Sequence, residues 1–335
     1  MRVFYHDKCF DGAAAAAVFT AFYRARRDAE AAFEYCGLVH KATGLFEGAE
    51  FNGDDNAIVD FKYNPDPRVT WWFDHHQSAF LQPADGEHFR RDRSGQKFYD
   101  PQYRSCTAFL AQIAHDRFGF DVSGLQELIH WADVVDGALF ASAAEAIALG
   151  APALQLTLAI EGSRDSELAR QLIPDFLHFS LADLVRQPYV QTELAPLLAR
   201  HEQITAVLRE RSECRDGVIS FDLSDGDFEG YNKFAPYYWH PDGVYSVGIS
   251  LAQHRVKVSV GSNPWRSLPQ MANLANICER YGGGGHPRVG AISFAPGDLK
   301  TARDVAGEVV EELRRSYRAL QSATPLPASQ APRRA

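Results

Sequence analysis

The sequence predicts an α/β protein built from two domains. In its first third, short apolar runs that end on polar residues alternate with helical stretches, the pattern of buried parallel strands and their crossover helices. Strands return after about Gly217, behind a long helical region. A chain of 335 residues is also longer than one ordinary core requires. We therefore expect a larger N-terminal domain over 1–190, a helical linker over 191–215, a smaller α/β domain over 216–321 and a disordered tail over 322–335.

The N-terminal domain is predicted from three strands and two helices. The strands are the runs 2–5, 57–59 and 69–73, whose aliphatic and aromatic residues suit the centre of a sheet. The alanine-rich stretch 12–27 is predicted to be a helix that packs closely on that sheet. A second helix over 106–117 follows Ser105, whose hydroxyl suits the N-cap position.

The rest of the chain is predicted to be helical first and mixed afterwards. Helices fill 125–208, and the i, i+3, i+4 spacing of leucine and isoleucine at its end indicates a one-sided helix that connects the domains. Strands are expected at 218–221, 245–251, 256–260 and 291–294, followed by a helix at 299–320. The tail is rich in proline, alanine and serine, a composition typical of disorder.

The composition limits the location and the partners of the protein. Five cysteines without a C-x-x-C pair indicate neither a disulfide framework nor a zinc ribbon, and they fit a reducing cytoplasm. No signal-peptide pattern opens the chain, and no apolar run approaches the roughly 20 residues of a membrane span. A formal net charge of −9 argues against binding of long duplex nucleic acid but not of a short phosphorylated substrate. The oligomeric state stays open, a homodimer included.

Residues of the types that commonly bind metal ions follow each of the three predicted strands. Because ligands gather beyond the carboxyl ends of parallel strands, these side chains are expected to converge. Carboxylates and imidazoles suit Mn²⁺, Mg²⁺ or Zn²⁺, and a shared carboxylate holds two ions about 3.5–4 Å apart. Asp60 and Asp74 are the two candidates for that bridge. The converging residues are His6 and Asp11 after the first strand, Asp60 after the second, and Asp74, His75 and His76 after the third.

Three segments of the sequence resemble motifs of one known family. The triplet Asp74-His75-His76 after an apolar strand resembles the motif that names the DHH phosphoesterase superfamily. The segment HDKCFDG, which begins at His6, resembles the first motif of that family. The run GGGGHPRVG over 282–290 resembles the glycine-rich GGGH motif of the DHH-associated domain. The three occur in the family's order and together cover most of the chain.

The resemblance implies roles for the individual residues. The N-terminal domain becomes the metal-binding catalytic domain, with Asp74 in a catalytic role beside His76, which supports the site or touches the scissile phosphate. The fourth family motif is an Asp at the end of a helix, where Asp133 and Asp136 are both candidates; we favour Asp133. The ligands implied by the first three motifs are His6, Asp11, Asp60, Asp74 and His75.

Cys9 departs from the family pattern. Many members have a further Asp in the first motif where this sequence has Cys9. As a ligand, a soft thiolate would favour Zn²⁺ or Fe²⁺ over the Mn²⁺ that we otherwise expect. The alternative is a small buried thiol, because free cysteines are often buried.

The glycine run has a physical rationale of its own. Consecutive glycines let backbone N–H groups approach an anion closely, whereas the alternative is an ordinary flexible turn. Basic residues near the run can add charge-assisted hydrogen bonds to a phosphate. The basic residues of the preceding strand have an alternative explanation, because they could simply form the solvent-exposed face of that strand. The expected substrate-binding residues are Gly283, Gly284, Gly285, His286 and Arg288 in the run, and Arg255 and Lys257 in the strand.

Together these features predict a metal-dependent phosphodiesterase or exonuclease-like hydrolase. It is expected to use two divalent metal ions, Mn²⁺ foremost, and to hydrolyse short oligonucleotides, dinucleotides or small nucleotide phosphoesters by a two-metal mechanism. The alternatives are a cyclic-dinucleotide or polyphosphate hydrolase, and a non-catalytic metal- or nucleotide-binding regulator in which Cys9 marks a degenerate site.

Overall fold

A computed structural model describes residues 1–39, 44–226, 228, 230–252 and 255–323. The chain divides into two compact units. The N-terminal unit comprises Met1–Ala141 and Leu149–Leu198, and the C-terminal unit comprises Ser142–Ala148 and Ala199–Ala335. Their boundary at Leu198 falls inside the long helix α9 (Pro188–Arg211). The fold is α/β, as the sequence predicts.

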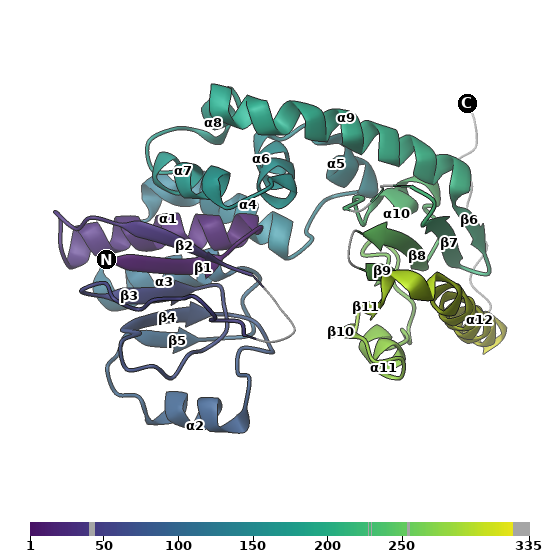
Figure 1. Cartoon of the computed structure of the whole chain (residues 1–335), viewed down its shortest axis with the longest axis horizontal. Coiled ribbons are helices and arrows are strands. Elements are labelled where there is room, and N and C mark those ends of the chain that lie inside the picture. The colour runs from purple at the N-terminus through teal and green to yellow at the C-terminus, as the bar shows by residue number, and fades with distance from the viewer. Residues whose placement is uncertain (40–43, 227, 229, 253–254, 324–335) are drawn as a thin grey trace. The chain divides into compact units, whose positions relative to one another are not determined.

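The N-terminal unit is built on a five-stranded parallel sheet in the order β2-β1-β3-β4-β5 (Figure 1). Three of the strands were expected from the sequence. The other two, β2 and β5, lie at the sheet's edges and are only partly buried, so they lack the apolar run that marks the central strands. The strands are β1 (Arg2–His6), β2 (Glu34–Leu38), β3 (Asn56–Val59), β4 (Trp71–Asp74) and β5 (Lys97–Tyr99).

Two apolar layers cover this sheet. On one face, α1 (Phe10–Arg26) packs against α3 (Cys106–Phe118) and α4 (Gln126–Asp136). Five consecutive alanines of α1, residues 13–17, are fully buried, which lets this helix approach closely. Trp71 belongs to this layer and Trp72 to the opposite one, and both are fully buried. Both tryptophans therefore pack in the core, as expected for the aromatic residues of the run 69–73.

Successive helices follow residue 125, as the sequence predicts for 125–208, whereas the helix at 83–91, between β4 and β5, was not predicted. The N-cap expected at Ser105 is confirmed, because its hydroxyl accepts a hydrogen bond from the backbone N–H of Ala108 at 3.1 Å. The helices that complete this part of the chain are α2 (Pro83–Arg91), α5 (Ala143–Ala148), α6 (Pro152–Gly162), α7 (Glu167–Asp175) and α8 (Leu181–Val185).

The C-terminal unit contains a six-stranded mixed sheet in the order β10-β11-β9-β8-β7-β6. Among its described strand pairs, only β7 and β8 run parallel. The helices α11 and α12 cover one face of the sheet, where alternate residues such as Val256, Val258 and Ile292 are fully buried. The elements are β6 (Glu213–Arg215), β7 (Val218–Leu223), α10 (Ala235–Trp239), β8 (Tyr245–Ala252), β9 (Arg255–Ser262), α11 (Leu274–Glu279), β10 (Gly284–His286), β11 (Val289–Phe294) and α12 (Leu299–Ala323).

Two differences from the sequence expectations concern the C-terminal unit. Part of the glycine run, expected as a loop, forms the short edge strand β10. Its glycines carry no apolar side chains, so no strand pattern marked it. The final helix extends to Ala323, three residues beyond its predicted end, and the rest of the predicted tail lies outside the described residues.

Candidate metal centre

The register of the parallel sheet brings the predicted metal ligands to one level. Tyr5 pairs with Val59, and Val59 pairs with Phe73, so β1, β3 and β4 end side by side. The next residue of each strand therefore emerges at the same edge. These residues are His6, Asp60 and Asp74.

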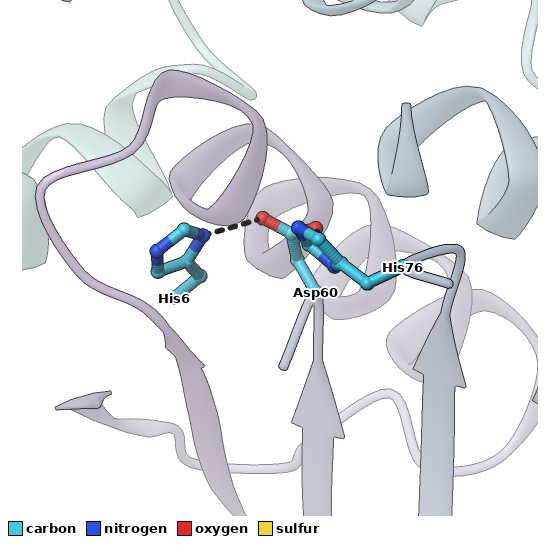
Figure 2. Close-up of side chains that lie close together, drawn as sticks. All are labelled: His6, Asp60 and His76. Atoms are coloured by element: carbon cyan, nitrogen blue, oxygen red, sulfur yellow. Dashed lines mark hydrogen bonds and ion pairs between the residues drawn. The ribbon is translucent and has the colours of Figure 1, made fainter. Parts of the chain in front are cut away.

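Asp60 lies at the centre of the cluster, and its two carboxylate oxygens face different histidines. Its Oδ2 is 3.2 Å from Nδ1 of His6. Figure 2 marks this contact with a dashed line. Its Oδ1 is 3.4 Å from Nε2 of His75 and 3.7 Å from Nδ1 of His76. The backbone of Asp60 has a φ of 58°, a left-handed conformation that turns its side chain out of the strand direction and that Asp tolerates better than most residues.

Two groups of residues offer ligand atoms that lie within 4.8 Å of one another. One group is His6, Asp60 and His76, and the other is Asp11, Asp60 and His75. Asp60 is common to both groups, the arrangement that a carboxylate shared between two cations requires. Two atoms in the cluster, Asp60 Oδ1 and His75 Nε2, are buried without a hydrogen bond among the described residues. Such orphaned polar atoms are costly unless another group satisfies them, so these residues fit metal ions.

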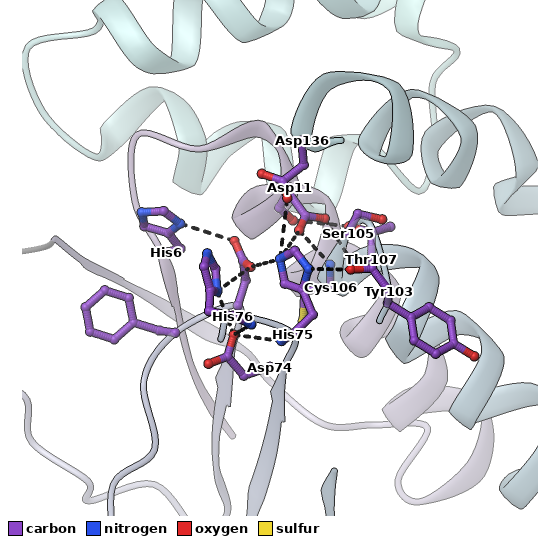
Figure 3. Close-up of polar contacts among 12 residues, drawn as sticks. His6, Asp11, Asp74, His75, His76, Tyr103, Ser105, Cys106, Thr107 and Asp136 are labelled. Atoms are coloured by element: carbon purple, nitrogen blue, oxygen red, sulfur yellow. Dashed lines mark hydrogen bonds and ion pairs between the residues drawn. The ribbon is translucent and has the colours of Figure 1, made fainter. Parts of the chain in front are cut away.

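A backbone carbonyl orients His75. The ring Nδ1 lies 3.1 Å from the carbonyl oxygen of Tyr103, so Nδ1–H donates to that oxygen. The opposite nitrogen, Nε2, then faces the carboxylates of Asp60 and Asp136. Figure 3 shows His75 between this carbonyl and the cluster. Metal-binding histidines are characteristically oriented by such a hydrogen bond. The sequence does not mark Tyr103 for this role, because the contact is made by its backbone carbonyl and not by its side chain.

Asp11 is held by the first turn of α3. Its Oδ2 accepts the backbone N–H of Cys106 at 2.7 Å, and its Oδ1 accepts that of Thr107 at 2.9 Å. The first N–H groups of a helix lack partners within the helix and attract negative charge. Asp11 is fully buried, and its Oδ2 is 3.7 Å from Nε2 of His75. The sequence could not reveal the contact with α3 because its partners lie far apart along the chain.

Asp74 accepts hydrogen bonds from the two residues that follow it in the chain. Its Oδ1 accepts the backbone N–H groups of His75 at 2.8 Å and His76 at 3.2 Å, and lies 2.7 Å from Nδ1 of His76. The second oxygen, Oδ2, is buried without a hydrogen bond among the described residues. Asp74 belongs to neither ligand group. The geometry therefore shows Asp74 fixing the orientation of His76, with one oxygen left for a further partner.

The two candidates for the fourth motif point to different places. Asp136, the last residue of α4, has its Oδ2 3.4 Å from Nε2 of His75. Asp133, one turn earlier, accepts a hydrogen bond from the hydroxyl of Ser105 at 2.6 Å. The structure thus places Asp136 in the cluster, as Figure 3 shows. Asp133 instead lies at the N-cap of α3, where it contacts Ser105.

The nearby carboxylates raise the pKa of two histidines in the cluster. Burial lowers the pKa of His75, but the nearby carboxylates, with Asp60 foremost, outweigh it and raise the pKa to about 10. Burial likewise lowers the pKa of His76, whereas the hydrogen bond with Asp74 and the charge of Asp60 raise it to about 9. The cluster therefore attracts positive charge strongly.

The carboxylates show the same crowding of negative charge. Burial raises the pKa of Asp11 well above its ordinary value, and the charges of Asp60 and Asp136 add to the effect. Burial also raises the pKa of Asp74. For Asp60 burial acts in the same direction, yet the nearby imidazoles of His6 and His75 prevail and leave its pKa below the ordinary value. Divalent cations are the groups that such a buried set of carboxylates and imidazoles accommodates.

The first-motif loop is anchored by residues that the sequence did not mark. Lys8 has a positive φ of 56°, and its ammonium donates to the carbonyl oxygens of Ser163 at 2.6 Å and Asp165 at 2.7 Å. Cys9 is the N-cap residue of α1 and makes no side-chain cap bond. Burial raises the pKa of the Cys9 thiol well above its ordinary value, with Asp60 adding to the effect, and Cys9 belongs to neither ligand group.

In the C-terminal unit the glycine run forms a β-hairpin. His286 of β10 pairs with Val289 of β11, so Pro287 and Arg288 form the turn. The backbone carbonyl of Arg288 accepts the N–H and the hydroxyl of Ser262, both at 3.0 Å. The side chains of His286 and Arg288 are exposed, in contrast to the buried N-terminal cluster.

The glycines of this run are required for different reasons. Gly282 has a positive φ of 75°. A Cβ at Gly283 would lie 2.2 Å from the carbonyl oxygen of Ala291, and one at Gly285 would lie 2.2 Å from that of Val289. A Cβ at Gly284 would meet no atom within 4 Å. Backbone packing therefore accounts for Gly283 and Gly285 but not for Gly284.

Strand register places the remaining candidates on one face of the mixed sheet. Directly opposed residues share a face, and so do alternate residues of one strand. Gly284 is opposite Ala291, which is opposite Ser259 of β9. Lys257 and Arg255 precede Ser259 by two and four residues and so lie on this same face, away from α11 and α12.

The fold and the cluster define a class of protein: a two-unit α/β protein with a buried histidine–aspartate centre suited to metal ions. No protein-family model and no curated protein matches the sequence. Solved structures do match. The pGpG-specific phosphodiesterase PggH from Vibrio cholerae has a TM-score of 0.64 at 16% identity, covering 95% of this chain and 99% of that one.

Two further structures share the fold. RecJ from Thermus thermophilus in complex with Mn²⁺ has a TM-score of 0.58 at 16% identity, covering 93% of this chain and 52% of the RecJ chain. An exopolyphosphatase-related protein from Bacteroides fragilis has a TM-score of 0.55 at 13% identity, covering 95% of this chain and 93% of that one.

A structure described as a DHH domain also matches, with a TM-score of 0.57 at 13% identity, over 93% of this chain and 87% of that one. The fold is therefore that of the DHH-domain proteins, as the three sequence motifs predict. Within the described residues, no helix combines the length and the apolar character needed to cross a bilayer.

Proposed function

We propose that this protein is a metal-dependent phosphoesterase that hydrolyses short oligonucleotides or small nucleotide phosphoesters with two divalent metal ions. The observation that carries the proposal is the position of Asp60, which belongs to both histidine-containing ligand groups. A shared carboxylate of this kind is characteristic of two-metal phosphoryl-transfer sites. The fold shared with a phosphodiesterase and with RecJ supports the same class of reaction.

In this proposal each ion has its own set of ligands. His6, Asp60 and His76 hold one ion, and Asp11, Asp60, His75 and Asp136 hold the other. Oxygen and imidazole ligands fit Mn²⁺, and RecJ structures contain Mn²⁺ or Mg²⁺. When bound, the two ions polarise the phosphate and lower the pKa of water.

The chain's own residues orient the reacting groups. Asp74 holds the ring of His76 through a 2.7 Å contact between its Oδ1 and Nδ1 of His76. We assign His76, which is partly exposed, to supporting the site as a ligand of the first ion, and Asp74 to keeping its ring in place. The burial of Asp11, Asp60 and Asp74 excludes bulk water from the carboxylates, which strengthens their electrostatic interactions.

Substrate binding is assigned to the glycine-rich hairpin and the adjoining exposed face of the mixed sheet in the C-terminal unit. The edge strand β10 pairs only with β11 among the described strands, so its outer edge offers backbone N–H groups to a phosphate. Exposed basic side chains beside it add charge-assisted hydrogen bonds. The residues assigned to this role are Gly283, Gly284, Gly285, His286, Arg288, Arg255 and Lys257.

A substrate panel tests the proposal. Purified protein with Mn²⁺ is assayed against linear dinucleotides, short RNA, short DNA, cyclic dinucleotides, polyphosphate and bisphosphorylated adenosine. We expect hydrolysis of a linear dinucleotide or a short oligonucleotide. Polyphosphate is included because an exopolyphosphatase-related protein shares the fold. Two equivalents of bound Mn²⁺ with no turnover of any substrate would instead identify a metal-binding regulator.

Exchange of Asp60 for Asn is the decisive variant. Asn tolerates the left-handed backbone of Asp60, so the fold is preserved while the shared charge is lost. We expect kcat/KM to fall about a thousandfold, since a metal ion contributes several kcal/mol of transition-state stabilisation. Calorimetry should show fewer than two bound Mn²⁺. The control is Asp66→Asn, which removes a surface carboxylate paired with Arg68. Full activity of Asp60→Asn would refute the proposed two-metal site.

A further inference from the structure

A pocket of about 520 Å³ lies between α3 and α4 in the N-terminal unit, and the metal centre does not use it. Its volume is in the range of small-molecule sites. Figure 3 shows the ring of Tyr103, one of its walls, pointing away from the metal-binding cluster. The floor and walls include the apolar residues Ala108, Ala111, Val122 and Ile129.

Two opposite charges line this pocket without pairing with each other. Arg104 is exposed and forms no ion pair or hydrogen bond from its side chain within the described part of the chain. Asp133 accepts the hydroxyl of Ser105 through Oδ1, which leaves Oδ2 for a further donor. A ligand with an anionic group at one end and N–H donors at the other would satisfy both.

The other polar residues of the pocket present acceptors. The side-chain amide of Gln112 donates to Asp116 at 2.7 Å, which leaves its carbonyl oxygen for other partners. The side-chain amide of Gln126 donates to the backbone carbonyl of Val122 at 3.2 Å, so its own carbonyl oxygen is also left for other partners. His115 has Nδ1 3.2 Å from a backbone carbonyl, so Nδ1 donates and Nε2 is an acceptor. Apart from Arg104, the pocket therefore favours a ligand rich in donors.

We propose that this pocket binds a guanine nucleotide at a site distinct from the metal centre. Guanine carries two adjacent donors, the ring N1–H and the amino group, and Asp133 can accept both, one at Oδ2 and one at the second lone pair of Oδ1. Adenine offers only its amino group. The phosphate pairs with Arg104, for which an anionic oxygen is the natural partner. The planar base fits between aliphatic side chains, and a free amino acid would leave most of the 520 Å³ unfilled.

Both walls of the pocket belong to segments that also contact His75 of the metal centre. Tyr103 lines the pocket, and its carbonyl oxygen holds Nδ1 of His75. The opposite wall is α4, where Asp133 lines the pocket and Asp136, one turn later, faces Nε2 of His75. A ligand that orders these walls therefore acts on the orientation of His75.

Calorimetric titration of the full chain in EDTA tests the binding site without metal ions or turnover, so its outcome is independent of the proposed hydrolysis. The probes are GMP, AMP and inorganic phosphate. We expect GMP to bind at least tenfold more tightly than AMP. Arg104→Met should weaken GMP about tenfold or more, and Asp133→Asn should remove the preference for GMP, since charged hydrogen bonds have this magnitude.

Matched variants on the same helices provide the controls. Arg117→Met removes an exposed arginine of α3, and Glu127→Gln an exposed acid of α4, and neither residue lines the pocket. Both should bind GMP as the wild type does. Circular dichroism confirms that each variant is folded. The proposal is overturned by the absence of GMP binding, by equal binding of AMP, or by wild-type binding in Arg104→Met.

The link to His75 has a separate readout. In EDTA, the ring nitrogen signals of His75 in ¹⁵N NMR should shift on addition of GMP, because Tyr103 accepts its Nδ1–H. The same addition to Arg104→Met should leave the signals in place. GMP binding without any change in the His75 signals would refute the link to the metal centre but not the proposed binding site.

Discussion

The two sheets hold their candidate functional residues in opposite environments. In the N-terminal sheet, Asp11, Asp60 and Asp74 are at most 1% exposed. In the C-terminal sheet, the side chains of His286 and Arg288 are exposed. Buried carboxylates are strongly unfavourable unless cations or hydrogen bonds compensate them, whereas exposed cations are satisfied by water. The buried sheet is therefore suited to resident ions, and the exposed hairpin to ligands that come and go.

The two regions also differ in how firmly each side chain is held. In the buried cluster, backbone groups of other segments fix the side chains, as the carbonyl of Tyr103 fixes His75. In the hairpin, the guanidinium of Arg288 donates to the hydroxyl of Ser267 at 3.1 Å, and the ring of His286 has no hydrogen bond among the described residues. Preorganisation favours precise metal geometry, and mobility favours adaptation to a substrate.

After exchange of Asp60, the largest effect is expected at the fourth-motif position, where two acids of one helix differ in environment. Asp136→Asn should weaken Mn²⁺ binding about 10- to 100-fold, since Asp136 faces the metal-directed nitrogen of His75. Asp133→Asn should change it less than threefold, because that residue accepts from Ser105 and an Asn oxygen can replace it. Titration calorimetry with Mn²⁺ measures both. The opposite ranking would place Asp133 in the metal centre.

The sequence predicts the central strands and the convergence of their ends for a clear physical reason. Central parallel strands are continuous apolar runs, so Asp60 and His75 stood out as polar residues directly after them. The edge strand β2 has a half-exposed pattern without that contrast. The helices at 12–27, 106–117, 125–208 and 299–320 were likewise expected, because composition and apolar spacing are local properties of the chain.

The contacts that shape the site could not be read in the same way. Asp11 is held by backbone N–H groups of α3, and His75 by the carbonyl of Tyr103. Any residue supplies such groups, so no residue type marks them. The choice between Asp133 and Asp136 depends on the rotation of α4, which tertiary packing sets.

A smaller effect is expected where the first-motif loop is tied to the helical region. The ammonium of Lys8 donates to carbonyl oxygens of Ser163 and Asp165, at the C-terminal end of α6, where a cation is also favoured by the helix dipole. Lys8→Met keeps the length of the side chain but loses these bonds. We expect a loss of about 1.5 kcal/mol in the free energy of unfolding of the N-terminal unit. Urea unfolding followed by the fluorescence of the buried Trp71 and Trp72 measures it.

The matched control for this variant lies in an exposed setting. Lys300→Met removes a surface ion pair with Asp304, in which the lysine side chain is 90% exposed. Such pairs contribute little, so stability should stay within about 0.5 kcal/mol of the wild type. Equal stability of Lys8→Met and the wild type would show that the loop does not depend on this anchor.

The smallest effect is expected in the exposed hairpin, at Gly284. A Cβ there meets nothing within 4 Å, so Gly284→Ala should leave the melting temperature unchanged. If β10 approaches the substrate, the added methyl group should raise KM about threefold, the effect of a lost or displaced weak contact, with kcat unchanged. Gly283→Ala is the contrast, because its Cβ would lie 2.2 Å from the carbonyl oxygen of Ala291 and should lower stability. An unchanged KM in Gly284→Ala would show that this part of the hairpin is structural, which would restrict substrate contact to the basic side chains beside it.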